Sequence, residues 1–158
     1  GIIGFSAGGH AAAAAATLFG HPDSRTGNEL DDVDARPDFV ALIYPVITMD
    51  ERFTHAGSRR NLIGSAPSPE RVTLLSIEDQ ITARTPPLFL AHCVDDKSVP
   101  VENSLNLFTR ARAQGVACEM HVYESGGHGF GMRASEHTSS TWPTPFEIWM
   151  QRHGWLAE

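Results

Sequence analysis

The chain has 158 residues, of which 41% are hydrophobic and 20% charged, and its net charge is −7. This length is enough for one domain with a substantial core, and the negative charge argues against nucleic acid or an anionic membrane as the main partner. No apolar run approaches the ~18 residues that a membrane-spanning helix needs. We therefore expect a single globular domain over residues 1–158.

The first half of the chain contains two apolar segments and one helix-forming segment. Residues 1–5 predict a short buried strand, and residues 8–19 predict an alanine-rich helix that stops at Gly20. Residues 21–36 are polar and predict a loop. Residues 38–44 are continuously apolar, as in a parallel strand that is buried on both faces.

The second half continues the alternation after a mixed segment, residues 50–64, that predicts a loop. Ser68 and Pro69 resemble a helix cap and first turn, so a short helix is expected to about Ser76. The later expected elements are a strand over 87–93, a helix over 101–114, a strand over 118–123 and a helix over 143–153. Steady alternation of this kind predicts an α/β fold: a parallel sheet of about four strands with flanking helices.

Two details of these elements can be checked directly. The helix over 101–114 is expected to bury Leu105, Phe108 and Ala111 along one face. Cys93 and Cys118 lie in apolar strand contexts, which favours buried thiols over a disulfide.

Ser6 lies between Gly4 and Gly8, directly after the first strand and before the first helix. This G-x-S-x-G pattern is the nucleophile elbow of α/β-hydrolases, in which a sharp turn pushes the serine Oγ out above the sheet. The positions two before and two after the serine are expected to be too crowded for side chains, which explains Gly4 and Gly8. On its own the motif is weak evidence, because roughly one chain in twenty of this size would contain it by chance, so its meaning depends on its partners.

A serine nucleophile needs a histidine base and a carboxylate that orients the histidine, and in this fold they follow in the order serine, acid, histidine. Asp95 and Asp96 follow the strand over 87–93, and His128 follows the strand over 118–123 between glycines. Both aspartates compete for the orienting role. Asp96 is favoured because the acid in D-x-x-V-P loops stands four residues before the proline, which is Pro100 here. Asp95 would then shape the loop.

The other histidines are interpreted as surface residues or as core residues with satisfied hydrogen bonds; they are His10, His21, His55, His92, His121, His137 and His153. No spacing of ligand-type residues indicates a metal or cofactor site, and Ser-His-Asp chemistry requires neither.

The chain resembles the carbohydrate acetyl esterases of the α/β-hydrolases, proteins labelled acetylxylan esterase. The likeness runs along nearly all residues and is carried by GFSAGGH over 4–10, RPDF over 36–39, IYPVI over 43–47, GSRRNLIG over 57–64, TPP over 85–87, DKSVPVENS over 96–104 and GGHGFG over 126–131. Position by position, the resemblance implies Ser6 as nucleophile, Asp96 as orienting acid and His128 as base. It also implies a small-molecule or oligosaccharide ester as substrate.

The chain departs from this family at its beginning, because such enzymes have about four strands before the elbow. We therefore expect the C-terminal half of an α/β-hydrolase domain, truncated at its N-terminus. The backbone N–H of Ala7 would supply one half of the oxyanion hole, and the loop that supplies the other half would be absent.

Three functional hypotheses follow. The first is a serine esterase that deacetylates sugars or xylo-oligosaccharides through an acyl-enzyme. The second is a related enzyme, either a prolyl-oligopeptidase-type peptidase or a dienelactone hydrolase-like enzyme. The third is that the isolated chain is an inactive fragment or a non-catalytic scaffold. The basic pair Arg59-Arg60 could contact an acidic sugar, although a solvated pair is the favoured interpretation.

Overall fold

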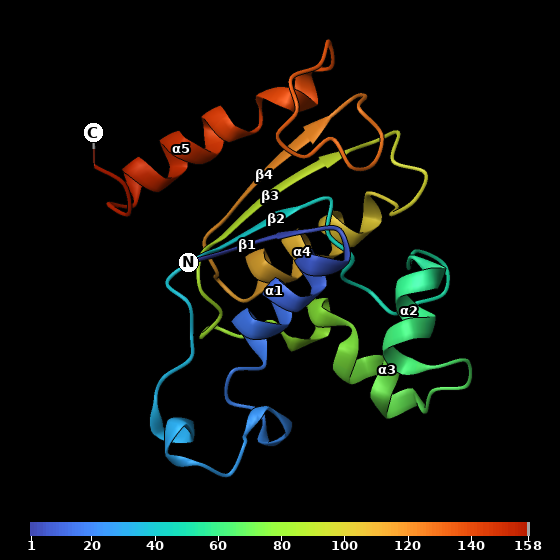
Figure 1. The fold of residues 1–158 in the computed structure, drawn as a ribbon, viewed down its shortest axis with the longest axis vertical. Coiled ribbons are helices and arrows are strands. Elements are labelled where there is room, and N and C mark those ends of the chain that lie inside the picture. Colours follow the sequence, from blue (N-terminus) through green and yellow to red (C-terminus); the bar gives the residue numbers. More distant parts are fainter. Residues whose placement is uncertain (158) are drawn as a thin grey trace.

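The computed structural model describes residues 1–157, and its centre is a sheet of four parallel strands in the order β1-β2-β3-β4 (Figure 1). The strands are β1 (Ile2–Phe5), β2 (Val40–Ile43), β3 (Leu88–Cys93) and β4 (Cys118–Tyr123). Each pairs in parallel with the next, so their carboxyl ends lie along one edge of the sheet. The predicted parallel sheet of about four strands is confirmed.

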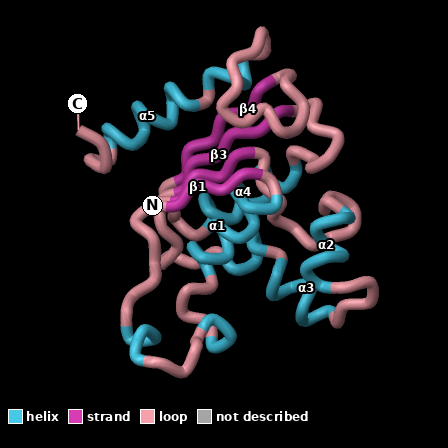
Figure 2. Tube along the Cα trace, viewed as in Figure 1, coloured by secondary structure: helices cyan, strands magenta, loops and turns pink. Residues whose placement is uncertain are grey.

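Helices cover both faces of this sheet (Figure 1, Figure 2). On one face lie α1 (Ala7–Thr17) and α4 (Glu102–Ala113), and on the other lies α5 (Pro143–Arg152). Two shorter helices, α2 (Ala56–Ile63) and α3 (Pro69–Leu75), lie beside the α1 and α4 layer. They are tied together by a hydrogen bond from the Arg71 guanidinium to the Leu62 carbonyl. Short 3₁₀ turns complete the chain at Pro22–Ser24, Glu29–Asp32, Ile77–Gln80 and Thr138–Thr141.

The continuously apolar strands contribute side chains to two hydrophobic cores, one on each face of the sheet. Side chains alternate across a strand, so Val40 and Leu42 pack toward α1 and α4 while Ala41 and Ile43 pack toward α5. All four are fully buried. Burying a valine, leucine or isoleucine side chain is worth about 1.5–3 kcal/mol, which is why the two central strands can be apolar throughout.

The two cores differ in composition. On the first face, Ala12, Ala13 and Ala16 of α1 have small side chains, which lets this helix pack closely on the sheet. On the second face the core is aromatic: Phe89 of β3 lies 5.1 Å from Phe146 and 5.7 Å from Trp149, both on α5.

One sequence expectation about the helices is wrong, and another is wrong in part. Residues 56–63 form α2, where a loop was expected, because the apolar periodicity that predicts helices is weak there. His55 caps this helix by accepting a hydrogen bond from the Ser58 N–H. In α4, Ala111 is buried and Phe108 is partly buried against the core, as expected, but Leu105 is 42% exposed and Leu107 is buried in its place.

The rotation of α4 is set by a buried polar side chain. The Asn103 amide oxygen accepts the N–H groups of Ile47 and Thr48, and its NH₂ group donates to the Phe53 and Pro100 carbonyls. These four bonds turn Asn103 inward and Leu105 outward, which hydrophobic periodicity alone does not reveal.

Neither cysteine is in a disulfide: Cys93 is buried and Cys118 partly buried, as expected. Within residues 1–157, no helix is both long enough and apolar enough to cross a membrane.

Candidate active site

Ser6 occupies the turn between β1 and α1. Its φ of 53° and ψ of −123° are unusual for a residue with a side chain, a conformation of the kind that costs on the order of 1–3 kcal/mol. Backbone hydrogen bonds hold the turn: the Ser6 N–H donates to the Ile43 carbonyl, and the Ser6 carbonyl accepts from the N–H groups of Gly9 and Val46. The end of β2 therefore fixes the serine where β1 meets α1.

The glycines around Ser6 only partly match expectation. A Cβ on Gly4 would lie 2.5 Å from the Gly8 carbonyl oxygen, so Gly4 is crowded as predicted. A Cβ on Gly8 would have nothing within 4 Å, so the prediction for Gly8 is wrong. The crowded position is Gly9, where a Cβ would lie 2.6 Å from the Pro45 Cβ. Position 8 faces outward from α1, and position 9 faces the end of β2.

This difference predicts opposite effects for two neighbouring substitutions. Gly9→Ala should lower the free energy of unfolding by about 1–3 kcal/mol, because the new methyl group overlaps Pro45. Gly8→Ala should raise it by up to about 1 kcal/mol, because alanine favours an open helical position. Urea unfolding of both variants measures the effects. Equal destabilisation by the two changes would contradict this account of the turn.

Ser6, His128 and Asp96 form one continuous chain of hydrogen bonds. The Ser6 Oγ lies 2.8 Å from His128 Nε2, and His128 Nδ1 lies 2.6 Å from Asp96 Oδ2. An ionised carboxylate can only accept, so Nδ1 carries the proton and Nε2 is left to accept from the Ser6 hydroxyl. The structure thus brings together the three side chains that the sequence singled out.

The Asp96 carboxylate is buried among hydrogen-bond donors. Oδ1 accepts the N–H groups of Ser98 and Val99, both at 2.9 Å. Oδ2 lies 3.4 Å from His92 Nε2, in addition to its bond with His128. Burial by itself raises the pKa of a carboxyl group, but these hydrogen bonds outweigh it and lower the pKa of Asp96 to about 2.

His92 contacts Asp96, and the sequence did not reveal this contact. It is fully buried in β3, as expected for a satisfied core histidine, but it also faces Asp96. Its Nε2–H donates to the Val99 carbonyl at 3.0 Å, and its Nδ1 accepts from the Ser104 hydroxyl at 2.8 Å. The one available signal was spacing. His92 lies near the end of β3, and Asp96 stands four residues later, just after that strand.

Asp95 holds the loop that carries His128. Its carboxylate accepts the N–H of Gly127 at 2.8 Å and that of Gly126 at 3.3 Å, which lowers the pKa of Asp95. Asp95 makes no hydrogen bond with His128, so of the two neighbouring aspartates Asp96 contacts the histidine.

The far end of the same loop is anchored at Gly131. Its N–H donates to the Tyr44 hydroxyl at 3.1 Å, and its carbonyl accepts from the Trp142 indole at 2.6 Å. The Tyr44 ring also lies edge-on to the His128 ring, with centroids 4.8 Å apart. Sequence reasoning placed Tyr44 in a strand and gave it no role; its φ of 40° marks it as an unusual residue of the site.

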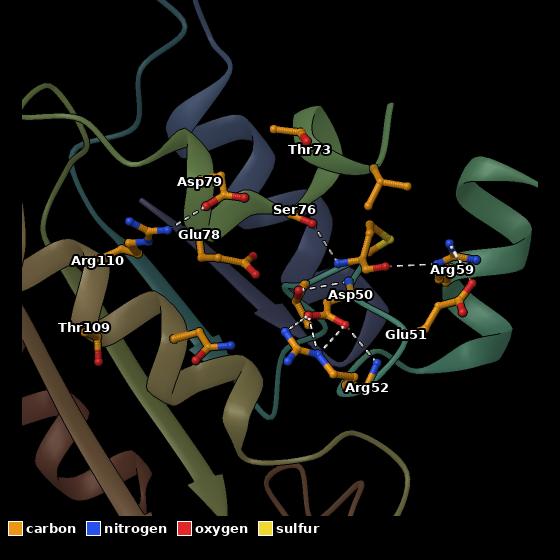
Figure 3. A pocket seen from close by; sticks show the side chains of 14 residues that line it. Asp50, Glu51, Arg52, Arg59, Thr73, Ser76, Glu78, Asp79, Thr109 and Arg110 are labelled. Atoms are coloured by element: carbon orange, nitrogen blue, oxygen red, sulfur yellow. Dashed lines mark hydrogen bonds and ion pairs between the residues drawn. The ribbon is translucent and has the colours of Figure 1, made fainter. Parts of the chain in front are cut away.

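A cavity of about 780 Å³ lies near the loop after β2, and half of the residues that line it are charged (Figure 3). Ion pairs within the lining join Arg52 to Asp50, Arg59 to Glu51 and Arg110 to Asp79. Burial raises the pKa of Glu78, which also lines this cavity. None of the lining residues belongs to the Ser6–His128–Asp96 chain.

The basic pair Arg59-Arg60 is therefore split. Arg60 is exposed, but the Arg59 side chain is only 14% exposed and donates to the Met49 carbonyl besides pairing with Glu51. The interpretation as a solvated pair is wrong for Arg59.

Within the described part of the chain, no group of three or more histidine, cysteine, aspartate or glutamate side chains is arranged to hold a metal ion.

Comparison with known proteins gives consistent matches. Residues 43–153 match the model of the prolyl oligopeptidase family. An endo-1,4-beta-xylanase B of Butyrivibrio fibrisolvens is 40% identical over 139 residues, covering 87% of this chain and 21% of that protein. An acetylxylan esterase of Xylanibacter ruminicola is 35% identical over 135 residues, covering 83% of this chain and 26% of that protein.

Among solved structures, the acetyl ester-xyloside bifunctional hydrolase of Caldicellulosiruptor lactoaceticus is 38% identical, with a TM-score of 0.92. That match covers 99% of this chain and 57% of the solved one. The chain thus spans about a fifth to a quarter of the two curated relatives and somewhat over half of the solved structure.

Proposed function

The chain belongs to the prolyl oligopeptidase family, and we propose that the protein containing it is a serine carboxylic-ester hydrolase that deacetylates sugars or xylo-oligosaccharides. The observation that carries the proposal is the unbroken hydrogen-bond chain from the Ser6 hydroxyl through His128 to the buried Asp96 carboxylate. The relatives named acetylxylan esterase and acetyl ester-xyloside hydrolase support the choice of substrate.

In the proposed first step, the Ser6 Oγ attacks the ester carbonyl carbon while its proton passes to His128 Nε2. The imidazolium that results is stabilised by the Asp96 carboxylate at Nδ1. The negative charge moves to the carbonyl oxygen. In this proposal the Ala7 N–H donates to this oxygen. Ala7 is the first residue of α1, where backbone N–H groups have no acceptor within the helix.

The tetrahedral intermediate then collapses as His128 returns the proton to the leaving sugar oxygen, and the carbon–oxygen bond to the alcohol breaks. The acyl group stays on Ser6. A water molecule attacks it next, giving its proton to His128, and release of acetate restores the serine hydroxyl. The ester, one water molecule and the three side chains account for every bond and proton in these steps.

A peptidase is the second candidate, because the matching family model is named after an oligopeptidase. Both reactions would use the same three side chains, so the substrate separates them. We expect acetate release from acetylated xylo-oligosaccharides, followed by a pH-stat or acetate assay, to exceed hydrolysis of a proline-containing peptide amide at least about a hundredfold in kcat/KM. Faster cleavage of the peptide would overturn the esterase assignment and support the peptidase.

A further inference from the structure

A second cavity, of about 310 Å³, lies directly beside the proposed oxyanion donor. One wall is the face of α1 that carries Ala7, His10 and Ala11. The opposite wall is α2, through Ser58, Asn61 and Leu62, and the loop after β2 contributes Val46 and Met49. A group bound here would therefore lie next to the carbonyl that Ser6 attacks.

The hydrogen-bond partner of His10 fixes what this histidine offers to the cavity. His10 Nε2 lies 2.8 Å from the Leu75 carbonyl oxygen, which can only accept, so Nε2 carries a proton. Burial lowers the pKa of His10, although the bond to Leu75 opposes this effect, so the ring is neutral at pH 7. Nδ1 then holds a lone pair, and no residue within 1–157 bonds to it. The α1 wall thus contains a hydrogen-bond acceptor for a ligand.

The rest of the lining combines apolar surface with the Ser58 hydroxyl, which bonds to His55, and one free amide. Ala7, Ala11, Val46, Met49 and Leu62 are apolar. The exposed Asn61 side chain makes no hydrogen bond to any described residue, so it can donate to and accept from a ligand. A sugar ring matches this combination, because it has apolar C–H faces and hydroxyl groups that donate and accept.

We infer that this cavity binds the alcohol half of the ester, a hydroxylated sugar ring, with a ring hydroxyl donating to His10 Nδ1 and another bonding to Asn61. The inference rests on the proposed function and adds the position of the sugar. The cavity is far larger than an acetyl group requires, whereas a single sugar ring fits within about 310 Å³. Helix α2, which the sequence did not predict, would then determine which alcohol is accepted.

Three esters separate the possible occupants: ethyl acetate, acetylated xylose and ethyl hexanoate. Leu62 is 39% exposed on α2, so Leu62→Trp can be accommodated and would fill the cavity. We expect the ratio of kcat/KM for acetylated xylose to that for ethyl acetate to fall about tenfold or more. Asn61→Ala fills no space and should lower the same ratio about three- to tenfold, the effect of one lost hydrogen bond.

The matched control is Leu105→Trp on α4, because Leu105 is similarly exposed and does not line this cavity. It should leave the ratio unchanged. The ratio of kcat/KM for ethyl hexanoate to that for ethyl acetate gives the opposite test. If this ratio fell while the ratio for acetylated xylose stayed unchanged, the cavity would bind the acyl chain and the inference would be overturned. An unchanged ratio in both α2 variants would overturn it too. Absence of ethyl acetate hydrolysis by the unmodified protein that contains this chain would instead refute the proposed esterase function.

Discussion

Replacing Ser6 by alanine is expected to reduce kcat for ethyl acetate by on the order of 10⁴-fold or more. The hydroxyl is the only side-chain group in the proposed mechanism that bonds covalently to the acyl carbon, and its Oγ lies 2.8 Å from the base that would accept its proton. Alanine keeps the Cβ, so the substitution adds no new backbone strain at the φ of 53°. The variant should therefore stay folded, with the same far-ultraviolet circular dichroism, and lose only the chemistry.

Ser125→Ala is the appropriate control for Ser6→Ala. Ser125 lies on the same loop as His128, but its hydroxyl bonds to His137 at the surface. This change should alter kcat by less than about tenfold, the effect of one exposed hydrogen bond. If Ser6→Ala retained more than a tenth of the unmodified rate, Ser6 would not be the nucleophile and the proposed mechanism would be refuted.

The sequence predicted most of the fold because the two central strands, β2 and β3, are buried on both faces and therefore carry a strong apolar signal. The strands and the helices other than α2 were placed to within a few residues, and the α/β-hydrolase fold and the likeness to acetylxylan esterases are confirmed. Prediction failed where polar contacts decide the structure. The capping of α2 by His55 and the four bonds of Asn103 depend on residues that are distant in sequence or not periodic.

The candidate site shows the same division. Ser6, Asp96 and His128 could be found because each follows a strand, and the carboxyl ends of parallel strands lie at one edge of a sheet. Their supporting residues could not be found in this way. Tyr44 and Trp142 reach the His128 loop through single hydrogen bonds to Gly131, and neither has a local sequence pattern that reports such a contact.

The second large effect is expected at Asp96. The three groups that hydrogen-bond to its carboxylate are N–H donors: Ser98 and Val99 at Oδ1, and His128 at Oδ2. His92 Nε2 lies 3.4 Å from Oδ2. In Asp96→Asn the amide oxygen would stay with the two backbone donors, and the NH₂ group would face His128 Nδ1. His128 would then have to accept at Nδ1 and carry its proton on Nε2, where it could no longer accept the proton of Ser6. We expect kcat to fall on the order of 10⁴-fold.

Asp95→Asn tests whether this loss is specific to Asp96. Asp95 is exposed and accepts only from the backbone of Gly126 and Gly127, so an asparagine oxygen can keep one of its two bonds. Its effect on kcat should be less than about a hundredfold. A larger loss in Asp95→Asn than in Asp96→Asn would mean that the two aspartates had been assigned in the wrong order.

Asp96→Asn should also change how stability depends on pH. The folded pKa of about 2 lies below the ~3.9 of an unfolded aspartate, so the ionised carboxylate stabilises the fold above pH ~4, and this stabilisation is lost as pH falls toward 2. At about 1.4 kcal/mol per pKa unit, the contribution is on the order of 2 kcal/mol. Asparagine does not titrate, so the difference in unfolding free energy between the two proteins should shrink by this amount between pH 5 and pH 2. Urea unfolding at both pH values measures it, and a constant difference would show that the donors around Asp96 do not favour its charged form.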